Sequence, residues 1–272
     1  MTNIHPTAIV EDGARISADA TVGPFSLIGS EVSLAEGVAV DARVIIRGRT
    51  SIGPRTRISA HAYIGGDPQD LSFRGEDTGI EIGADCIIRE NATVHRGTGH
   101  GRSMTSIGNN CFLMVGSHVA HDCIVGDHVI MTNNAMLGGH AEVGDYAILG
   151  GGAAVQQRAR IGVHCFIGGV TGVVRDVVPY AMAFGQHATI IGVNVRGLKR
   201  RGFDHADIHA LRAAFRMFFN THAPRNERID AMERTFGGVA AIGPLVAFLR
   251  AAGDRPLTLP KSDWAHDDDP DD

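Results

Sequence analysis

The most regular feature of the chain is an aliphatic residue at every sixth position. Isoleucine, leucine, valine or methionine recurs at this spacing from Ile4 to Ile64, from Ile82 to Val94 and, after a slip of one residue, from Ile107 to Val173. Helices repeat about every 3.6 residues and strands about every two, so neither explains a period of six. Three short strands joined by tight corners do, because each side of the triangle sends one aliphatic residue inward. The pattern therefore predicts a β-solenoid with triangular coils of about 18 residues.

The residues beside the aliphatic positions are small. Glycine often follows the inward residue directly, as at Gly23, Gly53 and Gly138, and we expect corners with positive φ there. A second small position lies two residues before the inward residue, and it includes every cysteine of the chain: Cys86, Cys111, Cys123 and Cys165. We expect the cysteines to fill corners as buried hydrophobic residues, without disulfides or metal, as in a reducing cytoplasm.

Two polar segments, residues 66–79 and 95–105, interrupt the repeat. Ile82 follows Ile64 by one coil length (82 − 64 = 18), so we expect the first segment to preserve the register. Loops that project from a rigid scaffold commonly carry function. The solenoid, with both loops, is assigned to residues 1–190.

The apolar period becomes helical after the solenoid. Residues 191–253 are predicted to form a helical domain that covers the open end of the solenoid, with Asp204 as a helix cap and Ile208, Leu211 and Phe215 on one face. Residues 254–272 are predicted to be a disordered acidic tail, since the last ten residues include six aspartates. Without these aspartates the formal net charge changes from −5 to +1 (−5 + 6).

The composition also excludes several classes of partner. No apolar run approaches the roughly 20 residues that a membrane span requires, and no signal peptide is recognisable, so we expect a cytoplasmic protein without membrane insertion. Basic residues are few and are not interleaved with aromatic residues. We therefore expect no nucleic-acid partner.

Three histidines, His118, His121 and His140, gather where a solenoid scaffold needs none. Residues one coil apart should stack at about 4.8 Å, so His121, Gly139 and Gln157 form one column and Asp122, His140 and Arg158 the next. Gly139 leaves a notch with a backbone N–H beside His121. Histidine suits proton transfer near neutral pH, and the adjacent Asp122 is a candidate to support it, although neighbours in sequence need not have side chains in contact. Surface histidines at a subunit seam and a three-histidine metal site remain alternatives.

Four segments together carry a resemblance to a known family, over nearly all of the chain from His5 to about Leu249. They are residues 64–71 (IGGDPQDL), 93–98 (TVHRGT), 118–123 (HVAHDC), and 192–194 (GVN) followed by 197–202 (GLKRRG). The chain resembles the acyl-carrier-protein–UDP-N-acetylglucosamine O-acyltransferases, which open lipid A synthesis.

This resemblance implies a left-handed parallel β-helix with a C-terminal helical domain, assembled as a homotrimer with active sites between subunits. It implies transfer of an (R)-3-hydroxyacyl group from acyl carrier protein to the 3-hydroxyl of UDP-N-acetylglucosamine, with no cofactor and no metal. His121 would be the general base, Asp122 its support and the Gly139 N–H the oxyanion donor.

The family's substrate contacts map onto nine further positions. The residues that match acyl-chain or sugar-nucleotide contacts are Gln69, Asp70, His118, His140, Gln157 and His187; Asn194 and Arg200 match uridine and phosphate contacts from a neighbouring subunit; Gly169 matches the acyl-length ruler. Because Gly169 has no side chain, the resemblance implies that the protein transfers a long hydroxyacyl chain. The chain departs from familiar members at Ser72, Gln156 and Arg196, which leaves details of the nucleotide or donor contacts open.

Rival functions differ in what they require. The related sugar-nucleotide N-acyltransferase has a domain ahead of its repeats, whereas the repeats here begin at Ile4. A trimeric zinc hydratase on the same scaffold needs three histidines converging on one metal. A passive scaffold would show repetitive outward faces rather than a histidine cluster. An acceptor with an amine in place of the 3-hydroxyl also remains open.

Overall fold

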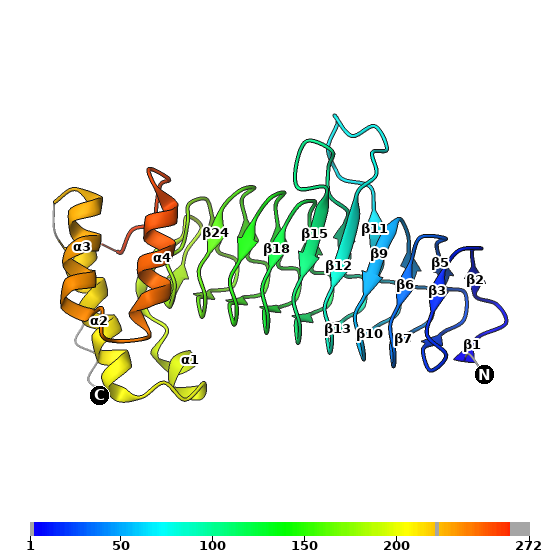
Figure 1. Ribbon diagram of the computed structural model, residues 1–272, viewed down its shortest axis with the longest axis horizontal. Helices are drawn as coiled ribbons and strands as arrows, with labels where there is room; N and C mark the ends of the chain where they lie inside the picture. Colours follow the sequence, from blue (N-terminus) through cyan, green and yellow to red (C-terminus); the bar gives the residue numbers. More distant parts are fainter. Residues whose placement is uncertain (1–2, 221–222, 262–272) are drawn as a thin grey trace.

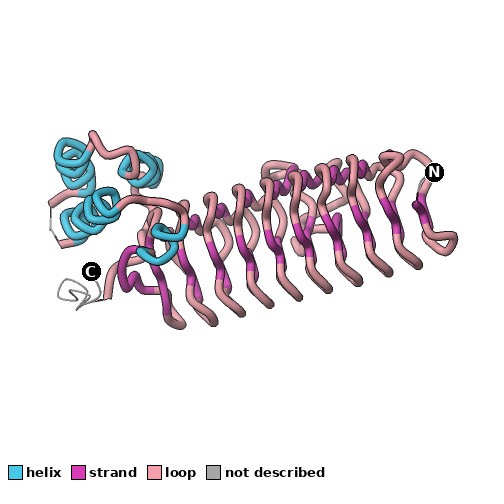
Figure 2. Tube along the Cα trace, turned by 90° about the horizontal axis from the view of Figure 1, so that it is seen from below, coloured by secondary structure: helices cyan, strands magenta, loops and turns pink. Residues whose placement is uncertain are grey.

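The computed structural model describes residues 3–220 and 223–261, and it is a long β-helix with helices at one end (Figure 1). Within these residues, strands one coil apart pair in parallel to form three sheets, which we call faces A, B and C; the last strand of face A, β28 (Thr189–Val193), is antiparallel to its neighbour. The predicted left-handed parallel β-helix with a C-terminal helical part is confirmed. In Figure 2 the coils are stacked side by side along the axis of the β-helix.

Each face is a ladder of short strands, one from each coil. Face A contains β1 (Asn3–Ile4), β4 (Thr21–Val22), β7 (Ala39–Val40), β10 (Arg57–Ile58), β13 (Ile87–Ile88), β16 (Phe112–Leu113), β19 (Ile130–Met131), β22 (Ile148–Leu149), β25 (Phe166–Ile167), β27 (Ala181–Phe184) and β28 (Thr189–Val193). Face B contains β2 (Ile9–Val10), β5 (Leu27–Ile28), β8 (Ile45–Ile46), β11 (Tyr63–Gly66), β14 (Thr93–His95), β17 (His118–Val119), β20 (Met136–Leu137), β23 (Ala154–Val155) and β26 (Gly172–Val173). Face C contains β3 (Arg15–Ile16), β6 (Ser33–Leu34), β9 (Arg49–Ile52), β12 (Gly79–Ile82), β15 (Met104–Ile107), β18 (Ile124–Val125), β21 (Glu142–Val143) and β24 (Arg160–Ile161).

The aliphatic residue at every sixth position forms the core, as the pattern predicts. Ile28, Ile64 and Leu137, for example, are fully buried. Burying each such side chain contributes about 1.5–3 kcal/mol relative to exposure, and the contribution repeats in every coil. All four cysteines are free and buried, as predicted, and each thiol points at a backbone carbonyl.

The expectation of positive φ at the glycines is wrong for nearly all of them. The left-handed residue of a corner lies three positions after the inward residue and is usually not glycine, as at Asp122 (φ 59°) and His140 (φ 60°). The glycines directly after the inward residue are required by space. A Cβ at Gly53 would stand 2.5 Å from the backbone of Gly83 in the next coil.

The first interruption is not a whole coil, which corrects the predicted register. Ile82 pairs with Ile52, and Ile64 pairs with Val94, so the chain leaves the corner between faces B and C after β11 and returns there at β12. The second interruption does the same between β14 and β15. Residue spacing alone does not reveal the projecting loop, because a loop of twelve residues has the same length as two hexapeptides.

In the described part of the chain, four helices follow the solenoid: α1 (Val195–Arg200), α2 (His205–Phe219), α3 (Arg225–Phe236) and α4 (Ile242–Ala252). Asp204 caps α2 through a bond from the Asp207 N–H, and Ile208, Leu211 and Phe215 are buried, as predicted. β-structure continues to Val193, beyond the predicted boundary at 190. Within residues 3–220 and 223–261, no helix has the length and apolar character that a bilayer span requires.

The predicted disordered tail is wrong for residues 254–261. Leu257 pairs with Asp176 and Pro260 with Ile190, which lays this segment along the end of the solenoid. The Arg255 guanidinium adds an ion pair of 2.8 Å to the buried Asp176 carboxylate. The remaining tail residues, 262–272, lie outside the described residues.

Stacked rings join the helical part to the corner between faces C and A. His128, Tyr146, His164 and Tyr180 stack in successive coils, with ring centroids 4.5–5.6 Å apart, and Phe203 packs edge-on against His164. The Arg201 guanidinium lies 4.2 Å from the centre of the Tyr146 ring. Burial, helped by the Arg201 charge, lowers the pKa of His164 to about 4.

The lowered pKa of the half-buried His164 predicts that acid destabilises the protein. The folded protein favours neutral His164, whereas in the unfolded chain the imidazole binds a proton near its ordinary pKa of 6.5. The stabilisation is therefore complete above pH 6.5, declines as the pH falls from 6.5 to about 4, and levels off below. His164→Phe keeps a ring in the stack without this proton, so its melting temperature should fall less over that range. Parallel melting curves for wild type and variant would contradict the assignment.

Candidate active site

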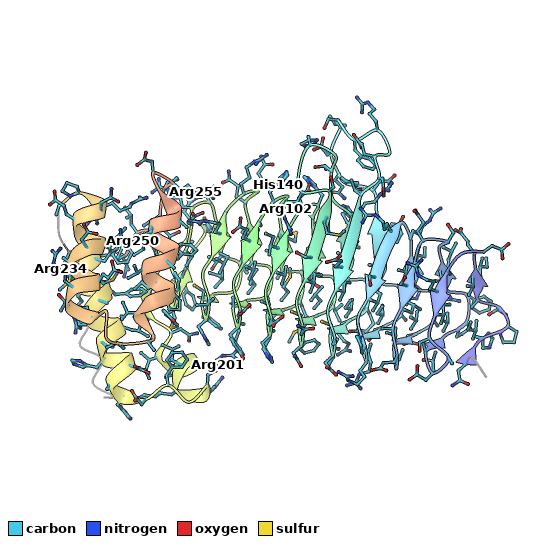
Figure 3. The ribbon with its side chains drawn as sticks, viewed as in Figure 1. Arg102, His140, Arg201, Arg234, Arg250 and Arg255 are labelled. Carbon is cyan, nitrogen blue, oxygen red and sulfur yellow. The ribbon has the colours of Figure 1, made fainter. Side chains whose placement is uncertain are left out.

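The three predicted catalytic residues, His121, Asp122 and Gly139, lie at the corner between faces B and C, where both loops also emerge. Loop 67–78 joins β11 to β12, loop 96–103 joins β14 to β15, and the next two coils place His121 and His140 at the same corner. The two loops project on one side of the solenoid (Figure 1), and His140 and Arg102 lie on that side (Figure 3). One corner of the scaffold thus holds all the candidate proton-transfer groups.

His121 and Asp122 form a hydrogen-bonded pair. His121 Nδ1 lies 2.9 Å from Asp122 Oδ2, and the Asp122 side chain is completely buried. The contact between adjacent residues, which the sequence leaves undecided, depends on the backbone. Asp122 occupies the left-handed corner position, which turns its carboxylate back toward the imidazole before it.

Loop 96–103 closes over the Asp122 carboxylate. Thr98 donates to Oδ2 through its hydroxyl (2.6 Å) and its N–H (3.0 Å), and the Arg102 N–H donates to Oδ1 (2.8 Å). A Cβ at Gly101 would stand 2.5 Å from both carboxylate oxygens. The glycine-rich composition of this loop is explained by this close approach.

The charge of Asp122 determines the tautomer of His121. Burial raises the pKa of Asp122, but the hydrogen bonds from Thr98 and His121 and the charge of His140 outweigh it, so the pKa lies below the usual range. An ionised carboxylate only accepts hydrogen bonds, so His121 Nδ1 must carry the proton. His121 Nε2 therefore keeps its lone pair and is able to accept a proton.

Gly139 lies directly beside His121 in the next coil. A Cβ at Gly139 would stand 2.5 Å from His121 Cε1 and Nε2, so only glycine leaves the imidazole in place. Among residues 3–220 and 223–261, no acceptor faces the Gly139 N–H. Proline, which has no N–H, occupies the same corner position at Pro24 and Pro54. Within the described residues this donor is thus unpaired, at a glycine that lies against the His121 ring.

Two further histidines flank the pair. The His140 ring stands 5.0 Å from the His121 ring and perpendicular to it, with His140 Nδ1 3.9 Å from Asp122 Oδ2. His118 contacts the Thr93 hydroxyl at 2.8 Å. Burial is the main cause that lowers the pKa of both His118 and His140. These imidazoles are therefore biased toward the neutral form around His121.

Loop 67–78 brings Asp70 to the same corner. Hydrogen bonds from the Ser72 hydroxyl and N–H lower the pKa of Asp70, and the charges of His100 and His121 act in the same direction. Gln69, beside it, is exposed. Asp70 is thus an anionic group at the mouth of the site.

The remaining predicted contacts do not converge on His121 within one chain. Gln157 is exposed one coil further on, and Gly169 lies at the corner between faces A and B. His187 is exposed in the turn between β27 and β28. Asn194 is occupied within its own chain: it caps α1 through Gly197 N–H and donates to the His164 carbonyl (2.8 Å). Arg200 is exposed on α1, on the side of the solenoid opposite the loops (Figure 1).

Within the described residues of one chain, His118 does not join His121 and His140 in a cluster of possible metal ligands. The compact set of possible ligands is instead His121, Asp122 and His140, whose donor atoms lie within 4.8 Å of one another. The Asp122 carboxylate, however, already accepts bonds from Thr98, Arg102 and His121. A metal would have to displace these donors, so the arrangement suits proton transfer better than metal binding.

Sequence reasoning missed the residues that hold Asp122 and Asp70. Thr98, Gly101, Arg102 and His100 all lie in loop 96–103, and Thr105 accepts the Asp122 N–H at 2.8 Å. The signal available was the glycine-rich interruption itself. Which carboxylate the loop surrounds depends on contacts between coils, which spacing does not specify.

Comparisons with known proteins agree with this architecture. A family model described as UDP-N-acetylglucosamine O-acyltransferase, domain 2, matches residues 176–258, and one described as bacterial transferase hexapeptide (six repeats) matches residues 104–139. The fold and the corner site together define an acyltransferase of the hexapeptide-repeat class.

Solved structures of relatives specify the family. LpxA from Acinetobacter baumannii is 35% identical, with a TM-score of 0.91, and the match covers 95% of this chain and 100% of that chain. UDP-N-acetylglucosamine O-acyltransferase from Moraxella catarrhalis is 37% identical (TM-score 0.91; 94% and 100% covered). UDP-N-acetylglucosamine acyltransferase from Francisella novicida is 32% identical (TM-score 0.90; 95% and 95% covered). The chain belongs to the UDP-N-acetylglucosamine O-acyltransferase family.

Proposed function

We propose that the protein transfers an (R)-3-hydroxyacyl group from acyl carrier protein to the 3-hydroxyl of UDP-N-acetylglucosamine, the first step of lipid A biosynthesis. Membership of the family supports the reaction type and the acceptor. The observation that supports the mechanism is the His121–Asp122 pair, with the unpaired Gly139 N–H beside His121 Nε2.

In the proposed reaction His121 Nε2 takes the proton of the 3-hydroxyl as that oxygen attacks the thioester carbonyl carbon. The resulting oxyanion accepts a hydrogen bond from the Gly139 N–H. Collapse of the intermediate forms the ester and expels the thiolate of the acyl carrier protein. This thiolate then accepts, from His121 Nε2, the proton that came from the sugar hydroxyl. The Asp122 carboxylate stabilises the imidazolium between these steps.

We further propose that the enzyme is a homotrimer. The outward residues of faces A and B form largely apolar columns, for example Ile87, Phe112 and Ile130 on face A and Ile9 and Ile45 on face B. Those of face C are mostly polar, for example Arg15, Ser33, Glu81, Glu142 and Arg160. A closed ring of identical chains needs two different surfaces on each chain, and faces A and B supply them.

The proposed trimer also completes the substrate site. Arg200 lies on α1, across the solenoid from the loops of its own chain, so it reaches a His121 site only in a neighbouring subunit. There its guanidinium fork suits the diphosphate of the sugar nucleotide. We assign Asn194 and His187 to the same shared site, with Gln69, Asp70, His118, His140 and Gln157 contributed by the subunit that supplies His121.

The function is tested by incubating the purified protein with UDP-N-acetylglucosamine and a series of (R)-3-hydroxyacyl carrier-protein thioesters and weighing the products. We expect one acyl group on the sugar nucleotide, in an ester linkage that mild base cleaves. An acceptor with a 3-amino group is the second arm. Acylation of the amine alone would indicate that the acceptor is the 3-amino sugar, and no product with either acceptor would contradict the proposal.

The same assay tests Gly169 as the acyl-length ruler. A Cβ at Gly169 would meet nothing closer than the Gly151 carbonyl oxygen, at 3.3 Å, and Gly169 is exposed, so a side chain has room to shorten a groove there. We expect wild type to prefer the longer thioesters and Gly169→Met to prefer shorter ones, by about tenfold in relative kcat/KM. Unchanged chain-length preference in Gly169→Met would reject this role.

A further inference from the structure

Three imidazoles lie in a row between two carboxylates at the corner between faces B and C. Asp122, His121 and His140 form the inner end of this row. His100 continues it outward, with its ring 6.4 Å from the His140 ring and its Nε2 3.3 Å from Asp70 Oδ2. The inner groups are used by the proposed reaction, whereas nothing in that reaction yet uses His100.

The two oxygens of Asp70 have different partners. Oδ1 accepts hydrogen bonds from the Ser72 hydroxyl (2.7 Å) and the Ser72 N–H (2.8 Å), and Oδ2 faces His100 Nε2. The Asp70 side chain is 23% exposed and the His100 side chain 49% exposed, so both line the open mouth of the site. The carboxylate is therefore held from both sides yet remains accessible to a ligand.

The backbone of His100 is fixed by the inner pair. Gly101 packs against the Asp122 carboxylate, and its N–H bonds to the Thr98 carbonyl at 3.1 Å. On the other side, Gly99 packs closely against Glu76 of loop 67–78. His100 thus stands at the apex of a glycine-flanked turn that connects the reacting end of the site to the loop that carries Asp70.

We propose that Ser72 and His100 are positioning residues, one on each oxygen of Asp70, which orient this carboxylate to accept a hydrogen bond from a hydroxyl of the acceptor sugar. This assignment rests on the acyl transfer proposed above. It gives a role to Ser72, one of the positions at which the chain departs from the family it resembles. Its short hydroxyl reaches Asp70 rather than a ligand.

The test uses the full-length His100→Ala, His100→Gln and Ser72→Ala proteins. Loss of either partner frees the carboxylate to rotate, so we expect KM for UDP-N-acetylglucosamine to rise roughly 5- to 20-fold in the alanine variants, while kcat stays within about twofold. His100→Gln retains a donor and should recover part of the loss. Calorimetric Kd values for UDP-N-acetylglucosamine without the acyl donor should rise in parallel. His209→Ala, an exposed histidine on α2, is the matched control and should match wild type.

The Asp70→Asn background separates positioning from direct binding. If His100 acts through Asp70, His100→Ala adds little to the effect of Asp70→Asn. An undiminished additional effect, or wild-type KM and Kd in both alanine variants, would overturn the assignment while leaving the proposed function intact. Absence of transfer by the wild type would overturn both.

Discussion

His121→Ala is expected to reduce kcat for acyl transfer by roughly a thousand-fold, because general-base catalysis by a positioned histidine contributes about 10²–10⁴. The imidazole is held at Nδ1 by a buried carboxylate, and its Nε2 lies against Gly139. Kd for UDP-N-acetylglucosamine should change far less than kcat, since the ring acts chiefly in the transition state. Single-turnover rates with a hydroxyacyl carrier-protein thioester provide the measurement.

His121→Gln is the matched variant for this test. It preserves side-chain volume better than alanine but supplies no base, so it should lose nearly as much activity. Melting temperatures of both variants show whether the solenoid is intact. Wild-type turnover in a folded His121→Ala protein would end the general-base assignment, and a similar loss in His209→Ala would show that the effect is not specific to this ring.

Gly139→Ala is expected to lower kcat by about a hundred-fold or more, although it adds one methyl group and removes nothing. The new Cβ would stand 2.5 Å from His121 Nε2 and Cε1, so the imidazole has to move. A displacement of about 1 Å at a reacting group can cost about 10² in rate. The measurement is kcat in the transfer assay, together with kcat of the His121→Ala, Gly139→Ala double variant.

Because both substitutions act on one ring, the double variant should lose little more than His121→Ala alone. Gly151→Ala is the control for folding. Gly151 occupies the same position relative to its inward residue, but its added Cβ would meet nothing closer than the Asn133 carbonyl oxygen at 3.6 Å. Comparable melting temperatures with loss of activity only in Gly139→Ala would support the steric argument. Full activity in Gly139→Ala would contradict it.

Much of the fold follows from the sequence because the solenoid is periodic. A residue such as Leu137 contacts its neighbours in adjacent coils in the same way as every other inward residue, so one repeat predicts the stacking of all. The spacing of one coil also predicts that His121 lies over Gly139, and the structure confirms this. The prediction failed where the period is interrupted, since spacing cannot tell a loop that returns to its own corner from an added coil.

The less predictable part of the site is the set of contacts made by those loops. Asp122 and His121 are adjacent in sequence, but their contact depends on the left-handed conformation of Asp122. Thr98, Gly101 and Arg102 surround the same carboxylate from another coil, and His100 faces Asp70 from a different loop. Loop contacts of this kind are set by local backbone geometry rather than by a repeating pattern.

The sequence by itself determined the triangular solenoid, its helical end and the column that holds His121 and Gly139, because a strict hydrophobic period leaves few ways to bury one aliphatic residue per side. Only the tertiary structure decided that both interruptions leave and return at one corner, and that loop 96–103 buries and saturates the Asp122 carboxylate. The physical reason is that periodicity specifies only which residues are neighbours one coil apart. The charge of Asp122 and the tautomer of His121 depend instead on hydrogen bonds made by a loop.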